Sequence, residues 1–94
     1  MFGLSEEVYL KIIEKINKYQ NEFLIFGSRA REDYKKNSDI DIAVNGAVTE
    51  KEKMMIRNEF DMLDIPYTID LIFINNIDKK ELLESIKREG IKLG

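Results

Sequence analysis

The sequence predicts an α/β domain in which helices flank a small mixed three-stranded sheet, in the order α-β-(α)-β-α-β-α. Segments with apolar residues at helical spacing alternate along the chain with short apolar runs that are typical of strands. The chain has 94 residues, which is the size of one domain, and no repeat or low-complexity linker divides it. We therefore expect a single domain over residues 1–94.

The first half of the chain predicts a helix, a strand and a short helix. Ser5 and the two glutamates that follow it are a helix-start signal, and apolar residues then recur at helical spacing to about Tyr19. Residues 22–27, EFLIFG, form a short apolar run closed by glycine, which suits a buried central strand. The next segment, residues 28–34, is compatible with a short helix before a polar loop.

The second predicted strand, residues 39–44, has the sequence DIDIAV and alternates strictly. Side chains two positions apart lie on the same face of a strand, so Asp39, Asp41 and Ala43 share one face. The isoleucines and Val44 occupy the other face. The Asn-Gly pair that follows is typical of a turn.

The remaining elements are a helix, a third strand and a last helix. Thr49 and the glutamate three residues later make a capping box for the first of these helices. The single proline ends that region, and residues 67–74, YTIDLIFI, are rich in β-branched and aromatic residues, as strands are. Asp78 and a glutamate three residues later predict another capping box, and Gly90 is the expected end of the last helix.

The composition excludes several kinds of chemistry. The chain has no cysteine and no histidine, which rules out disulfides, thiolate zinc sites, cysteine nucleophiles and Ser-His-Asp catalysis. Carboxylates remain as the acid, base or metal-binding groups. The net charge of −3 disfavours a general nucleic-acid binder. Since there is no signal-peptide pattern and no apolar run long enough to span a bilayer, we expect a cytoplasmic protein.

Three aspartates occupy strand positions where apolar residues would be expected: Asp39, Asp41 and Asp70. Asp39 and Asp41 project from the same face of their strand and can converge on one point. Like charges placed side by side destabilise a sheet, and a hard divalent cation offsets that repulsion. Mg²⁺ is the natural candidate, because it combines one or two carboxylates with phosphate oxygens and water.

The Gly27-Ser28 pair supplies a complementary anion site at the end of the first strand. Free backbone N–H groups at a helix start favour an anion, glycine permits close approach of a phosphate, and serine adds a hydroxyl. The guanidinium groups of Arg29 and Arg31 suit phosphate oxygens. If the first two strands are adjacent and antiparallel, Gly27 and Asp39 share one end of the sheet.

These residues resemble a known family. Gly-Ser, ten residues and then Asp-Ile-Asp resembles the Gly-Ser-x10-Asp-x-Asp signature of the DNA polymerase β-like nucleotidyltransferases. The sequence GSRAR…SDIDIAV resembles that of the minimal nucleotidyltransferase (MNT) subgroup, and Asp70 in IDLIF matches the third carboxylate of the family. The resemblance covers nearly the whole chain and implies the polymerase β-like nucleotidyltransferase fold. Glu32 departs from the pattern, because these proteins often carry glycine there.

The resemblance implies a Mg²⁺-dependent nucleotidyltransferase. Two Mg²⁺ ions held by Asp39, Asp41 and Asp70 would bind a nucleoside triphosphate, expected to be ATP, and an acceptor hydroxyl would attack its α-phosphorus. Subgroup members commonly pair with a small all-helical HEPN or substrate-binding protein. The resemblance thus implies an antitoxin that transfers AMP to a tyrosine of its toxin partner, within a homo- or hetero-oligomer.

Other interpretations of the same residues stay open. The chain could be a catalytically weak nucleotide-binding antitoxin that acts by complex formation, or it could modify a small molecule such as an aminoglycoside. Locally, Asp39 could cap a strand and Asp41 and Asp70 could be solvated surface charges. Arg29 and Arg31 could pair with neighbouring acids on a surface helix.

Overall fold

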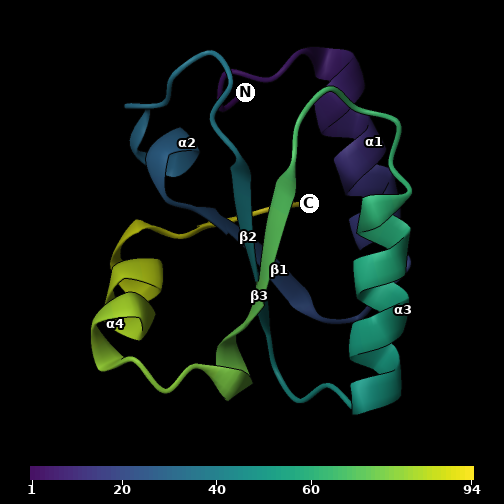
Figure 1. Ribbon diagram of the computed structural model, residues 1–94, viewed down its shortest axis with the longest axis vertical. Coiled ribbons are helices and arrows are strands. Elements are labelled where there is room, and N and C mark those ends of the chain that lie inside the picture. The colour runs from purple at the N-terminus through teal and green to yellow at the C-terminus, as the bar shows by residue number, and fades with distance from the viewer.

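A mixed sheet of four strands organises the computed structural model, which describes residues 1–94. Helices cover both faces of the sheet: α1 and α3 lie on one side, and α2 and α4 lie on the other (Figure 1). The elements in chain order are α1 (Glu6–Ile16), β1 (Glu22–Phe26), α2 (Ser28–Arg31), β2 (Ile40–Asn45), α3 (Glu50–Asp61), β3 (Ile69–Phe73), the 3-10 turn η1 (Ile74–Asn76), α4 (Lys80–Glu89) and β4 (Ile91–Lys92). This is the predicted α/β class and order, with one strand added.

The strands are ordered β3-β2-β1-β4 across the sheet. β1 is antiparallel to both β2 and β4, whereas β2 and β3 are parallel. The three predicted strands are therefore confirmed. The first two are adjacent and antiparallel, which is the condition under which Gly27 and Asp39 share one end of the sheet. The edge strand β4 was not predicted, because a strand of two residues is too short to show a periodic pattern.

The alternation of β2 divides the apolar residues between two layers. Ile40, Ile42 and Val44 are fully buried in the larger core cluster, which also contains residues of α1 and α3. Ala43 faces the other way, into a smaller cluster with Phe26 and Ile86 of α4. Fully burying an isoleucine or valine side chain contributes about 1.5–3 kcal/mol to the free energy of unfolding. The larger cluster, which buries more of these side chains, therefore supplies most of this stabilisation.

Two of the three predicted helix caps are present. The Ser5 hydroxyl accepts the Val8 N–H at 3.2 Å, and Thr49 forms its reciprocal capping box at the start of α3. The capping box predicted at Asp78 is wrong, because α4 begins after Lys79 without a side-chain cap. There the packing of Ile77 and Leu82 on the smaller core cluster, rather than a cap, accompanies the helix start.

The ends of the helices differ slightly from the predicted ones. α1 ends at Ile16 rather than at Tyr19, and Gly90 follows the last residue of α4 as predicted. None of the helices combines the length and the apolar character that a bilayer span requires.

Candidate active site

Gly27 and Asp41 meet where β1 ends beside the start of β2. The antiparallel register pairs Phe26 with Asp41, and Gly27 is the next residue along the chain. Gly27 has φ 74° and ψ −153°, a backbone conformation that is essentially restricted to glycine. A Cβ atom at this position would overlap the Asp41 carboxylate. Glycine is thus needed here both for its backbone and for the space it leaves beside a carboxylate oxygen.

The three aspartates lie at the same end of the sheet. Asp41 and Asp70 are direct register partners on the parallel strands β2 and β3. Asp39 precedes β2 and lies two positions before Asp41, so its side chain projects toward the same face. Asp39 and Asp70 are exposed and Asp41 is half-buried, which makes Asp41 the deepest of the three.

The electrostatics of Asp41 follow from this placement. Burial raises the pKa of the Asp41 carboxyl above its ordinary value of 3.8, and the negative charges of Asp70 and Asp39 raise it further. Arg31 has the opposite, smaller effect on this pKa. The ionised form of Asp41 is thus less favourable here than in an isolated aspartate.

These carboxylates suit a hard divalent cation. All of the donors are oxygens, the site is open to solvent, and the charge repulsion at Asp41 is what a cation would relieve. In their present rotamers the side chains do not form a ready-made group of three ligands. They would have to turn toward a shared ion.

Ser28 is the first residue of α2 and lies directly beside Gly27. The first N–H groups of a helix have no partner within the helix, so they can donate to an anion. Because α2 has only four residues, such donation depends on individual N–H groups rather than on a helix dipole. Gly27 and Ser28 therefore form a small polar cradle next to Asp41.

Arg31 is held by acids on two elements. Its Nε donates to Asp33 Oδ2 at 3.0 Å, and its Nη1 donates to Glu89 Oε2 of α4 at 2.9 Å. The side chain remains 44% exposed, and exposed ion pairs contribute only about 0–1 kcal/mol. Arg31 can therefore exchange these partners for a phosphate at little cost. The pairing with Glu89, 58 positions away, has no signal in the sequence.

Arg29 occupies a different environment from the one predicted. The residue is 1% exposed, and its guanidinium donates to the backbone carbonyls of Ser38 and Phe2. The rings of Tyr34 and Tyr67 lie against the same group. This placement is at odds with a direct nucleotide contact, because the donors point into the protein. An arginine next to Gly-Ser carries no sequence signal of burial.

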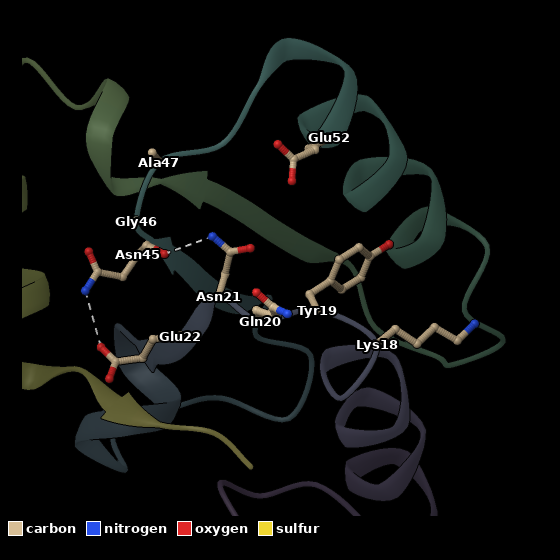
Figure 2. Close-up of a pocket in the computed structure, with 9 residues that line it drawn as sticks. All are labelled: Lys18, Tyr19, Gln20, Asn21, Glu22, Asn45, Gly46, Ala47 and Glu52. Atoms are coloured by element: carbon tan, nitrogen blue, oxygen red, sulfur yellow. Dashed lines mark hydrogen bonds between the residues drawn. The ribbon is translucent and has the colours of Figure 1, made fainter.

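An open hollow lies at the opposite end of the sheet. It has a volume of about 510 Å³ and lies between the start of β1 and the end of β2, next to α3 (Figure 2). Asn21 donates to the Asn45 carbonyl at 3.2 Å, and Asn45 donates to Glu22 at 3.3 Å, so its polar groups partly satisfy one another. None of the predicted site residues lines it. We therefore take the end of the sheet that carries the aspartates as the candidate active site.

A known protein family matches most of the chain. The family model described as "Polymerase beta, Nucleotidyltransferase" matches residues 10–93, which includes every residue of the site. The chain belongs to this family. It is a nucleotidyltransferase, and members of the family generally use a nucleoside triphosphate and a divalent metal.

Solved structures show the same fold. A crystal structure of a toxin–antitoxin with AMP-PNP has a TM-score of 0.68 and 24% identity, covering 92% of this chain and 72% of that one. A mutant of the toxin–antitoxin MntA–HpeT has a TM-score of 0.65 and 22% identity, covering 92% and 71%. A putative nucleotidyltransferase from Sulfolobus solfataricus has a TM-score of 0.50 and 22% identity, covering 90% and 76%. A search of curated protein sequences found no match.

Proposed function

We propose that this nucleotidyltransferase transfers AMP from ATP to a tyrosine hydroxyl of a HEPN-type helical partner, and that it acts in the cytoplasm as the antitoxin of a toxin–antitoxin pair. The observation that carries the proposal is the contact of Gly27 with Asp41, which is itself paired with Asp70. This contact supports the proposal, because an anion bound at Gly27 and Ser28 would lie beside two carboxylates.

Asp39, Asp41 and Asp70 would hold Mg²⁺, with two ions expected for this family. When bound, Mg²⁺ neutralises charge on the triphosphate and the carboxylates. Gly27 and Ser28 would receive phosphate oxygens through backbone N–H groups and the serine hydroxyl. Arg31 would leave its acid partners to contact the phosphates. Arg29 is not among the ligands in this scheme, since its guanidinium is buried.

The reaction is a displacement at the α-phosphorus. The acceptor oxygen forms a new bond to phosphorus, the bond to the bridging oxygen of pyrophosphate breaks, and pyrophosphate leaves. The acceptor loses a proton, which exposed Asp70 can accept before passing it to solvent. Asp41 is half-buried, which suits a ligand of the Mg²⁺ that would hold the nucleotide in place. No histidine is needed for any of these steps.

The acceptor is expected on another protein. The two most similar structures described above are toxin–antitoxin complexes, and one contains AMP-PNP, whose chemistry matches an ATP site. Exposed Met54, Met55 and Met62 on and after α3 offer an apolar contact surface for such a partner or for a second copy of the chain.

A binding-only antitoxin is the second candidate. Glu32 replaces the glycine of the family pattern at a residue with positive φ. Its negative charge close to the proposed phosphate site would weaken nucleotide binding. In that case the chain would neutralise its partner by complex formation alone.

Transfer in the purified pair distinguishes the two candidates. The chain and the helical protein encoded beside it would be incubated with Mg²⁺ and ATP labelled at the α-phosphate. We expect an AMP group on a tyrosine of the partner, identified by mass spectrometry, and none with Asp41→Asn. The exposed Asp78→Asn variant controls for loss of one negative charge. A stable complex that binds ATP but never becomes labelled would favour the binding-only antitoxin.

A further inference from the structure

Arg29 is a buried charge without an acidic partner. It is the largest side chain among the fully buried residues, with 1% of its surface exposed. Arginine is seldom buried to this degree unless its charge is paired. The seven ion pairs of the structure do not include Arg29. Burying a guanidinium without an acidic partner is unfavourable unless its N–H donors are hydrogen-bonded. The hydrogen-bond partners of Arg29 therefore indicate its role in the structure.

Those contacts join three separate parts of the chain. Arg29 Nε and Nη2 both donate to the Ser38 carbonyl, at 3.2 and 2.8 Å, and Nη1 donates to the Phe2 carbonyl at 2.9 Å. The guanidinium carbon lies 5.1 Å from the ring centre of Tyr34 and 4.7 Å from that of Tyr67. Stacking on aromatic rings stabilises the cation where water is excluded. Only a planar fork of donors can make these contacts together.

The Ser38 carbonyl belongs to the same rigid peptide unit as the N–H of Asp39. Ser38 is also fixed by its other groups: its N–H donates to the Lys35 carbonyl at 3.0 Å, and its hydroxyl accepts the Lys35 N–H at 2.7 Å. On the other side of Asp39, the Ile40 N–H donates to the Thr68 carbonyl at 2.9 Å. Asp39 is thus an exposed residue whose backbone is held on both sides.

We infer that Arg29 is a positioning residue, which orients Asp39 toward the metal by holding the Ser38 carbonyl. The inference rests on the proposed function, because it takes Asp39 as a metal ligand. Groups that orient a ligand without touching the metal typically change metal affinity about 10- to 100-fold when they are removed. Lysine at position 29 would keep the charge but could not bond both carbonyls and stack on both rings.

The test compares Arg29→Lys with the wild-type protein in two measurements. Calorimetric titration of ATP at a series of Mg²⁺ concentrations gives the Mg²⁺ concentration needed for half-maximal binding, which we expect to rise about 10- to 100-fold. Amide hydrogen exchange of the metal-free protein should become faster at residues 35–40. Val8→Ala, a buried α1 residue in the larger core cluster, is the control for lost stability, and it should leave both quantities near wild type.

The possible results separate this inference from the proposed function. A wild-type protein that does not bind Mg-ATP contradicts the proposed function. A wild-type protein that binds Mg-ATP, together with an Arg29→Lys variant that has an unchanged Mg²⁺ requirement or unchanged exchange at residues 35–40, overturns the role of Arg29. If Arg29→Lys does not fold, Tyr34→Leu removes one ring and keeps the hydrogen bonds. It should change both measurements in the same direction by a smaller factor, and no change would also overturn the inference.

Discussion

Asp41 and Asp70 are register partners on the parallel strands β2 and β3, so two acidic side chains lie next to each other on one face of the sheet. Like charges in such positions destabilise a sheet by roughly 0.2–1 kcal/mol. The two aspartates therefore lower the free energy of unfolding at the point where the proposed site needs negative charge. Replacing either aspartate should change this free energy measurably.

Asp41→Asn should stabilise the metal-free protein and abolish its response to Mg-ATP. Removing the half-buried charge relieves repulsion from Asp70 and Asp39, and we expect the melting temperature to rise by up to about 5 °C. Mg-ATP should raise the melting temperature of the wild-type protein by linkage, but not that of the variant. Thermal unfolding with and without Mg-ATP measures both effects, with Asp78→Asn as the control. A variant with a full response to Mg-ATP would show that the assigned site is wrong.

Asp70→Asn should separate binding from transfer. Asp70 is exposed and lies opposite Asp41. Its proposed role is to accept the proton of the acceptor hydroxyl, which is needed mainly in the transition state. We expect the variant to keep much of its Mg-ATP affinity and to lose at least about 100-fold in transfer rate. Calorimetry gives the affinity, and labelling of the partner gives the rate. Transfer at the wild-type rate would end the role proposed for Asp70.

Glu32→Gly should stabilise the protein and improve nucleotide binding. Glu32 has φ 68° and ψ 21° at the end of α2, a left-handed conformation that costs a non-glycine residue about 1–2 kcal/mol. The entropy of the more flexible unfolded glycine chain offsets part of this, so we expect a net gain of about 0.5–1 kcal/mol. The substitution also removes a negative charge next to Arg31. Denaturant unfolding and Mg-ATP titration test the two effects. Glu84→Gly, at an exposed position in the interior of α4, should instead destabilise the protein.

The ion pair between α1 and α3 should make stability depend on acid pH. Glu59 Oε2 lies 2.9 Å from Lys15 Nζ and 3.5 Å from Lys18 Nζ, and the hydrogen bond from Lys15 lowers the Glu59 pKa below its ordinary value of 4.5. A carboxyl whose pKa is lower in the folded state stabilises the fold above its unfolded pKa. That stabilisation disappears as the pH falls through the folded pKa.

Glu59→Gln should therefore lower the melting temperature near neutral pH, and its difference from wild type should shrink as the pH falls below the ordinary glutamate pKa of 4.5. Exposed Glu84→Gln is the control and should follow the wild-type curve. A difference between Glu59→Gln and wild type that stays constant with pH would contradict this assignment.

Much of the fold was predictable because local pattern and tertiary packing agree. Ile40, Ile42 and Val44 alternate with polar and small residues, and the structure buries them in the larger core cluster as that pattern indicates. The ten residues between Gly27-Ser28 and Asp39 are fewer than most parallel crossovers need, and the two strands are indeed adjacent and antiparallel.

What could not be predicted depends on contacts between distant residues. The burial of Arg29 requires the carbonyl of Phe2, which lies 27 positions away, and no local pattern reports such a partner. The start of α4 coincides with packing of Ile77 on the smaller core cluster, so the capping signal at Asp78 was misleading. The short edge strand β4 exists because Leu24 and Ile25 of β1 offer an open pairing edge.

The alternation of β2 also protects the protein against misfolding. Asp41 lies one position from Ile40 and Ile42, both fully buried. If β2 paired with its neighbours one residue out of register, Asp41 would turn into the larger core cluster and the isoleucines of β2 would face water. Burying even one unpaired carboxylate is prohibitive in such a core. The aspartates proposed to bind metal would therefore also disfavour a shifted register of β2 during folding. Replacing both Asp39 and Asp41 by alanine would remove this effect as well as the proposed metal ligands.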